Sequence, residues 1–139
     1  MVSGIQIKSM KKDFQKWHNR KELLHKEKIR PFFREREVWF CTLGVNIGFE
    51  QDGSGTEFLR PTLIIKKFNN EVFWGLPLTK NLKKSRYYYQ FFIEKKEEMS
   101  TAILSQVKLT DAKRLQYKLG DISEKDLMEM KKRLIEFLK

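Results

Sequence analysis

Residues 38–79 read VWFCTLGVNIGFEQDGSGTEFLRPTLIIKKFNNEVFWGLPLT and are the most informative part of the chain. Apolar and β-branched runs at Val38–Leu43, Arg60–Phe68 and Glu71–Leu78 alternate with polar segments, which is typical of short antiparallel strands joined by turns. Pro61 fits only at the start of its strand, because proline cannot donate to a β-ladder. The asparagine pair before Glu71 predicts a hairpin turn, and Asp52–Gly55 predicts a flexible loop tip.

The chain after Thr79 continues the same alternation of short elements. We predict a basic loop, a strand, a charged turn, a further strand, a short helix-like turn running into a brief strand, and a final helix: Lys80–Arg86, Tyr87–Ile93, Glu94–Glu98, Thr101–Leu109, Lys113–Leu119 and Ser123–Lys139. Ser123 followed by Asp126 approximates a capping box and places the helix itself at about residues 124–138. Several strands closed by one amphipathic helix favour a small, strongly bent sheet or barrel.

Residues 1–35 form an extension with a different composition. Apolar residues of the segment 11–29, among them Phe14, Trp17 and Leu24, recur at helical spacing between many lysines and arginines, and Pro31 follows. This predicts a basic amphipathic helix over about residues 11–29, whereas residues 1–9 show no pattern and are expected to be unassigned or flexible. The helix either docks its apolar stripe on the domain, which we favour, or acts as an RNA-contacting arm or a membrane-surface helix.

The fold class that follows is mainly β with helices (α+β), in one domain over residues 36–139. A domain of this size buries roughly two-thirds of its unfolded surface and needs no disulfide or metal. Cys41 is the single cysteine and lies in an apolar run, so it is expected to be a small buried hydrophobe. An intracellular, cytoplasmic location fits this cysteine usage.

The formal net charge of +11 predicts a polyanionic partner. Nucleic acid, an anionic membrane surface and an acidic protein are the candidates. No apolar run approaches the ~20 residues of a spanning helix, and the N-terminus lacks the apolar core of a secretory signal. Membrane is therefore the weakest of the three.

Arg60 and Thr79 are the residues whose chemistry fits a phosphate. They lie at ends of neighbouring predicted strands, where a guanidinium fork and a hydroxyl could face one phosphate. Alternatively, Arg60 pairs with Glu50 or Glu57, and Thr79 satisfies a strand end. The histidines, His18 and His25, lie on the predicted basic helix and are interpreted as surface residues. No acidic, histidine or cysteine set has the spacing of a metal site, so no metal or other cofactor is expected.

The chain resembles the MazF/PemK toxin family from about Arg36 to its C-terminus. The resemblance rests on short motifs in the family's order, namely Gly48-Phe49-Glu50-Gln51, Arg60-Pro61, the strand-ending Thr79, Leu104–Lys108, Asp111–Leu115 and Gly120–Ser123. It implies an SH3-like small β-barrel of the MazF/CcdB type with a C-terminal helix, generally a homodimer. The loop between Gln51 and Arg60 is longer than is usual in the family, and the basic N-terminal helix has no counterpart in the minimal family domain.

The resemblance also implies an activity. Members are toxins of type II toxin–antitoxin systems that cut single-stranded RNA, mainly mRNA, at specific sequences without a metal, by attack of the 2′-hydroxyl to leave 2′,3′-cyclic phosphate and 5′-hydroxyl ends. By position, Arg60 and Thr79 would be catalytic, and Glu50 and Gln51 would orient or bind the substrate. Four cations would bind RNA phosphates: Lys80, Lys83, Lys84 and Arg86. The implied partner is a cognate antitoxin with an acidic tail.

Two other functions remain open from the sequence. A related toxin of this fold poisons DNA gyrase by binding, without cutting nucleic acid. A plain RNA- or DNA-binding barrel would use the same excess of positive charge. The Arg60/Thr79 pair argues against the first, because gyrase binding requires neither residue.

Overall fold

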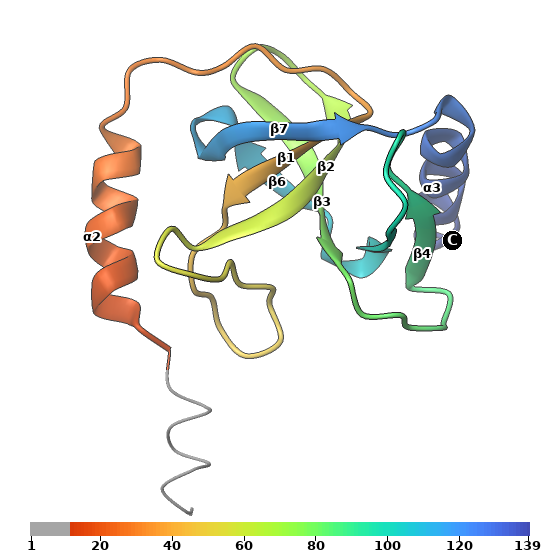
Figure 1. Cartoon of the computed structure of the whole chain (residues 1–139), viewed down its shortest axis with the longest axis horizontal. Helices are drawn as coiled ribbons and strands as arrows, with labels where there is room; N and C mark the ends of the chain where they lie inside the picture. Colours follow the sequence, from red (N-terminus) through yellow and green to blue (C-terminus); the bar gives the residue numbers. More distant parts are fainter. Residues whose placement is uncertain (1–11) are drawn as a thin grey trace, which may run out of the picture.

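The computed structural model describes residues 12–139 of the chain. A seven-stranded, entirely antiparallel sheet forms its centre, with one helix on each side (Figure 1). The elements are α2 (Phe14–His25), β1 (Glu37–Thr42), β2 (Leu59–Lys67), β3 (Val72–Thr79), β4 (Tyr88–Phe92), β5 (Met99–Ile103), the 3₁₀ turn η1 (Leu104–Gln106), β6 (Lys108–Asp111), the 3₁₀ turn η2 (Ala112–Arg114), β7 (Leu115–Asp121) and α3 (Glu124–Glu136). The α+β fold class is thereby confirmed.

The sheet bends strongly, and a separate hydrophobic core packs against each of its two faces. Strand order is β4-β5-β3-β2-β1-β7, and β6 pairs with the far end of β3. The larger core lies against α3 and includes Val38, Leu76 and Met130. The smaller one lies on the other side and includes Phe33, Ile64 and Phe73. Because neighbouring residues of β2 and β3 point to opposite faces, these two strands contribute to both cores.

The hairpin and the final helix form as the sequence predicts. The side chain of Asn69 accepts from the backbone N–H groups of Glu71 and Val72, which closes the β2–β3 turn. Ser123 caps α3, because its hydroxyl oxygen accepts from the N–H of Asp126 at 3.0 Å. The Asp126 carboxylate bonds the hydroxyls of Ser123 and Tyr89 in place of the backbone bond of a full capping box.

The prediction of one strand over Thr101–Leu109 is wrong. The segment is β5, the turn η1 and the start of β6. Leu104 at the break is fully buried, and its N–H donates to the carbonyl of Tyr87. This turn lets β5 pair with the C-terminal end of β3 while β6 pairs with its N-terminal end, which one straight strand could not do.

The loop between β1 and β2 differs from the sequence prediction as well. Asp52–Gly55 is not the tip, because Gly53 bonds the carbonyl of Gly44, and Ser54 exchanges two backbone hydrogen bonds with Leu59. The exposed tip is Ile47–Glu50, where Phe49 is 99% exposed. Glycines at this site therefore permit a tight return of the chain; a Cβ on Gly53 would lie 1.7 Å from the carbonyl oxygen of Phe58.

Helix α2 packs on the barrel, as the favoured interpretation predicts, but over a shorter span than residues 11–29. Trp17 and Leu24 are each only 6% exposed, whereas Phe14 of the same predicted stripe is 53% exposed. Residues 26–35 then run as an extended segment, which Arg30 fastens to β6 through two hydrogen bonds to Asp111, each 2.9 Å long. Residues 1–9, predicted to be flexible, lie outside the described residues.

Cys41 is fully buried in the middle of the sheet, between Arg60 of β2 and Leu115 of β7. Burial raises the pKa of its thiol to about 12, although a hydrogen bond with Thr62 and the nearby charge of Arg114 favour the thiolate. The prediction of a buried apolar role is confirmed. Among residues 12–139, no helix has the length and apolar character needed to cross a membrane.

Two methionines of α3 test how the helix is held. Met130 is fully buried in the larger core, and Met128 is 60% exposed. We expect Met130→Ala to lower the free energy of unfolding by about 2–5 kcal/mol, because it leaves a cavity. Met128→Ala should change it by less than about 0.5 kcal/mol. Urea denaturation followed by circular dichroism measures both, and equal losses would contradict this packing.

Candidate nucleic-acid interface

Arg60 and Thr79 lie on one face of the sheet and line one hollow. Strands β2 and β3 pair in a register that sets Leu63 opposite Leu76 and Thr62 opposite Pro77. Continued by two residues, this register brings Arg60 opposite Thr79. Both residues line a surface hollow of about 660 Å³. The guanidinium and the hydroxyl that the sequence singles out are therefore neighbours.

The guanidinium of Arg60 is held by backbone and not by a carboxylate. Its Nε donates to the carbonyl of Asp52, and Nη1 donates to the carbonyl of Leu78 at 3.0 Å. A guanidinium has five N–H donors, so these two bonds fix its plane and leave three donors without a described acceptor. Burial lowers the pKa of Arg60, and the Asp52 carboxylate opposes this shift. The alternative pairing with Glu50 or Glu57 is not what the structure shows.

Thr79 ends β3 with its hydroxyl proton uncommitted. Its Oγ1 accepts from the N–H of Asn81 at 3.2 Å, which leaves the hydroxyl hydrogen available to a ligand. Lys80 lines the same hollow and pairs with Glu98 at 3.3 Å, but both side chains are exposed, so this pair holds little energy. Lys95, Lys96 and Ser100 close the other side of the hollow. A tetrahedral anion here would meet a fixed guanidinium, a hydroxyl donor and exposed lysines, with the carboxylates of Glu97 and Glu98 also lining the hollow.

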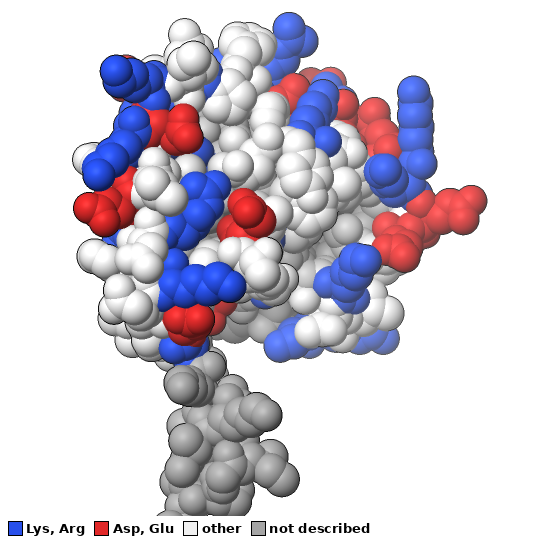
Figure 2. All heavy atoms as spheres, turned by 60° about the vertical axis from the view of Figure 1, so that its left-hand side comes forward, with Lys and Arg blue, Asp and Glu red and all other residues white. Residues whose placement is uncertain are grey.

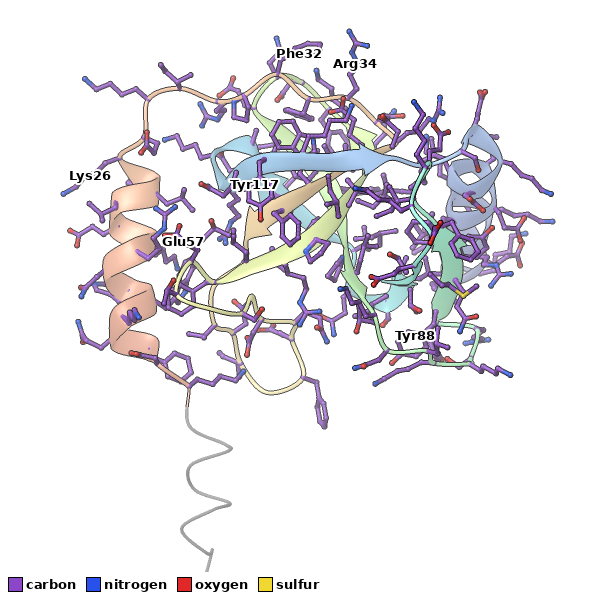
Figure 3. All side chains as sticks on the ribbon, viewed as in Figure 1. Lys26, Phe32, Arg34, Glu57, Tyr88 and Tyr117 are labelled. Atoms are coloured by element: carbon purple, nitrogen blue, oxygen red, sulfur yellow. The ribbon has the colours of Figure 1, made fainter. Side chains whose placement is uncertain are left out.

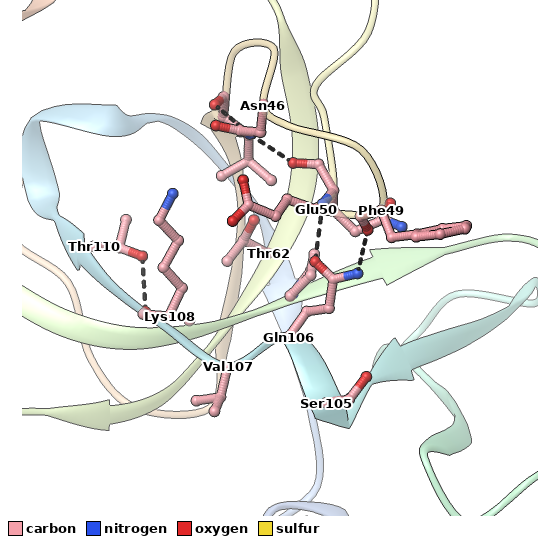
Figure 4. A pocket seen from close by; sticks show the side chains of 13 residues that line it. Asn46, Phe49, Glu50, Thr62, Ser105, Gln106, Val107, Lys108 and Thr110 are labelled. Carbon is pink, nitrogen blue, oxygen red and sulfur yellow. Dashed lines mark hydrogen bonds between the residues drawn. The ribbon is translucent and has the colours of Figure 1, made fainter.

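Glu50 and Gln51 line a second hollow, of about 520 Å³ (Figure 4). Thr62 and Pro77 also line it, and each lies two residues along its strand from Arg60 or Thr79, so both hollows are on one face of the sheet. Gln106 fastens the loop above it, since its side chain accepts from the Gln51 N–H and donates to the Phe49 carbonyl. The Glu50 side chain points into the hollow, and one of its oxygens accepts from the Ile47 N–H at 3.1 Å. Glu50 is thus placed to meet a ligand next to the Arg60 hollow, and it does not hold Arg60.

The remaining predicted cations lie apart from both hollows. Lys83, Lys84 and Arg86 belong to the exposed loop between β3 and β4. The ammonium of Lys83 lies 5.6 Å from the ring centre of Tyr88, and the guanidinium of Arg86 lies 5.0 Å from that of Tyr87. Tyr88, the first residue of β4, lies at this end of the molecule (Figure 3). Exposed cations next to aromatic rings suit a flexible polyanion better than a fixed small ligand.

Helix α2 supports the loop that holds Arg60. Trp17 packs on Phe58 with ring centres 5.4 Å apart and covers Gly44 so closely that a Cβ there would lie 2.1 Å from the indole. Lys12 forms an ion pair with Asp52 at 3.1 Å, and the carbonyl of that aspartate accepts from Arg60. Arg20 pairs at 3.8 Å with Glu57, which lies on the loop beside α2 (Figure 3).

Sequence reasoning missed the residues that hold the loop. Gln106 falls in one of the short motifs, but nothing local indicates that it reaches across to Phe49. Lys12, which pairs with Asp52 of the loop, lies far from it in sequence. His18 and His25 are both exposed on α2, as predicted. Among the described residues, no group of three histidine, cysteine or acidic side chains is arranged to hold a metal ion.

Comparison with known protein families shows to which family the chain belongs. The model of the PemK-like, MazF-like toxins of type II toxin–antitoxin systems matches residues 34–138. The chain belongs to this toxin family. The match leaves α2 outside it and includes both hollows. None of the curated proteins compared with the chain matches it in sequence.

Solved structures of MazF-type toxins share the fold. MazF from Deinococcus radiodurans aligns with a TM-score of 0.59 at 15% identity, over 80% of this chain and 98% of that one. An endoribonuclease from a mycobacterial species aligns at 0.58 and 13% identity, over 80% and 95%. A mycobacterial endoribonuclease in complex with its cognate antitoxin aligns at 0.56 and 13%, over 78% and 94%. The predicted family and barrel-like fold are confirmed.

Trp17→Ala tests whether α2 supports the loop of this MazF-like toxin. We expect the amide of Gly53, which bonds Gly44, to exchange its hydrogen about tenfold faster or more, since the loop loses the ring that covers it. Leu23→Ala is the matched control, because Leu23 is 62% exposed on the same helix. Hydrogen exchange followed by mass spectrometry measures both. Unchanged exchange in residues 43–58 of Trp17→Ala would show that the loop holds itself.

Proposed function

We propose that this MazF-like toxin is a sequence-specific, metal-independent endoribonuclease acting on single-stranded RNA, mainly mRNA. The observation that supports it best is the hollow that Arg60 and Thr79 line together. Backbone carbonyls fix the guanidinium, which has no carboxylate partner among residues 12–139, and the hydroxyl hydrogen of Thr79 is available to a ligand. RNA supplies its own nucleophile, so a site of this kind needs to orient the phosphate and stabilise charge, and needs no metal to generate hydroxide.

The reaction divides between these two side chains. The 2′-oxygen attacks the adjacent phosphorus and loses its proton to water, while the bond from phosphorus to the 5′-oxygen breaks. Arg60 binds two non-bridging oxygens and stabilises the charge of the phosphorane, and its guanidinium stays protonated, as arginine does in proteins. Thr79 donates its hydroxyl proton toward the leaving 5′-oxygen and regains one from solvent. The products are a 2′,3′-cyclic phosphate and a 5′-hydroxyl.

The second hollow serves recognition in this proposal. Glu50 is an acceptor-only side chain and would take hydrogen bonds from the amino groups of an unpaired base, next to the scissile phosphate. Gln51 holds the loop through its backbone bond to Gln106. Lys80, Lys83, Lys84 and Arg86 bind flanking phosphates, which makes RNA binding sensitive to salt.

The same cationic surface suits the regulatory partner expected for the family. We propose that a cognate antitoxin blocks cleavage with an acidic segment that competes with RNA for these cations. A mycobacterial endoribonuclease of this fold is known in complex with its cognate antitoxin, and so is MazF of Deinococcus radiodurans with MazE. A homodimer acting in the cytoplasm and arresting growth completes the proposal.

Cleavage in EDTA tests the proposal directly. We expect purified protein to cut a long unstructured RNA at discrete sites with cyclic-phosphate ends. Arg60→Ala should lower the rate by roughly 10²–10³, the usual loss when one oxyanion-stabilising donor is removed. Thr79→Ala should lower it by about 10²-fold, and Thr79→Ser should restore most of the rate because it keeps the hydroxyl.

Arg34→Ala is the matched control for charge, because Arg34 lies over Phe32, away from both hollows (Figure 3). We expect this variant to cleave RNA at the wild-type rate. Retained cleavage in Arg60→Ala would sink the proposed mechanism. Bound but intact RNA would favour a plain nucleic-acid-binding barrel, and no RNA binding would favour an interaction toxin.

Glu50→Gln tests the assignment of the second hollow to base recognition. The amide can donate as well as accept, so we expect the preferred sequence at the cut to change, with about 10- to 100-fold loss of preference at one position. Glu57→Gln, on the same loop but paired with Arg20 outside the hollow, should leave the sequence unchanged. Sequencing of product ends reads both, and an unaltered pattern for Glu50→Gln would remove Glu50 from recognition.

A further inference from the structure

Helix α2 carries basic side chains to one edge of the second hollow. The barrel contributes basic side chains of its own at the same edge, which is called the rim below. Trp17 fixes the helix there, because it packs on Phe58 and over Gly44. Lys21 follows Trp17 by one helical turn and therefore projects from nearly the same side of α2. Together with Trp17 and Val45 it lines a shallow depression between the helix and the loop.

Two cations of the barrel meet Lys21 at this rim. Lys108 of β6 lines the second hollow and points into it (Figure 4). The guanidinium of Arg114, from η2, lies 5.9 Å from the ring centre of Trp17, and its Nη1 donates to the carbonyl of Thr42 at 2.9 Å. Burial lowers the pKa of Lys108, and the charges of Arg114 and Lys21 lower it further, whereas Glu50 acts in the opposite direction. The positive charges of Arg114 and Lys21 therefore both act on Lys108.

These three cations differ from their neighbours in having no ion pair. Around α2, Lys12, Arg20 and Arg30 each pair with a carboxylate. Figure 2 shows lysines and arginines of this side lying among carboxylates. Within residues 12–139, none of Lys21, Lys108 and Arg114 has a carboxylate oxygen within 4.0 Å. Folding thus gathers three cations without ion pairs at one rim, whereas cations nearby are paired with carboxylates.

The rim lies in line with the Arg60 hollow. Along β3, Thr79 lines the first hollow, Pro77 and Gly75 line the second, and Gly75 pairs with Lys108 of β6. Four residues of strand separate Thr79 from Gly75, or about 13 Å at the usual rise. A single strand lying along this face would pass from Thr79 over the second hollow to the rim.

We propose that Lys21 and Lys108, supported by the partly buried charge of Arg114, bind one backbone phosphate of the RNA a few nucleotides from the scissile bond. This site deepens the proposed function and rests on it. It gives α2 a role in substrate binding that the family domain, which begins at residue 34, does not supply. Docking on the barrel and contact with RNA, which the sequence sets as alternatives, then both use nearly the same side of the helix, through Trp17 and Lys21.

The test measures binding without cleavage. The probe is an RNA that contains a cleavage site, with a 2′-deoxy sugar at the cut so that the nucleophile is missing. Affinity is measured by fluorescence anisotropy from low to high salt. We expect Lys21→Gln to weaken binding about threefold at low salt and to reduce the slope of log K against log salt by about 0.7, the value for one phosphate on a single strand. Lys26→Gln, on the same helix but paired with Glu22, should match wild type.

A double variant shows whether one phosphate is shared. If Lys21 and Lys108 hold the same phosphate, Lys21→Gln/Lys108→Gln should change the slope by about 0.7, as each single variant does, and not by about 1.4. Trimming the RNA from each end in turn should remove the effect of Lys21→Gln once the phosphate is lost. A wild-type slope for Lys21→Gln with cleavage intact would overturn the site alone, whereas a protein that neither binds nor cuts RNA would overturn the proposed function with it.

Discussion

The pairing of β2 with β3 is the constraint on which the candidate site depends. Its register sets Thr62 opposite Pro77 and, two residues on, Arg60 opposite Thr79. Side chains alternate between the faces of a strand, so a slip by one residue would send the guanidinium into the core that faces α3. The bonds from Arg60 to the carbonyls of Asp52 and Leu78 lock the fork in this position without neutralising it. A cation held by dipoles keeps its full charge for a phosphate, which an arginine in an ion pair does not.

Much of this arrangement follows from local sequence. The apolar runs locate most of the strands, Asn69 and Asn70 set the hairpin, and the serine at 123 begins the last helix. Two strands joined by a connection of only four residues, 68–71, have little choice of register, because each has to bury its apolar face. That is why residues as distant in sequence as Arg60 and Thr79 could be expected to meet.

The parts that the sequence did not predict depend on contacts between distant segments. Asp52–Gly55 has the composition of a loose loop, yet Gly44 and Leu59 bind it through the backbone. Glu50 belongs to the neighbouring hollow because Gln106 holds the loop there. The break at Leu104 arises because β3 needs different partners at its two ends. The composition of a segment indicates how flexible that segment would be in isolation. It does not indicate which distant segments bind to it in the folded chain.

The buried thiol gives this protein an internal reporter of sheet opening. Cys41 is the single sulfhydryl of the chain, is covered on both sides by β2 and β7, and has a pKa of about 12 in the native state. Only the thiolate reacts with an alkylating reagent, so the reagent modifies molecules in which β1 has come away from β2 and β7. The rate of alkylation therefore measures how often the barrel opens at this strand, and the measurement needs no dye, tag or added residue.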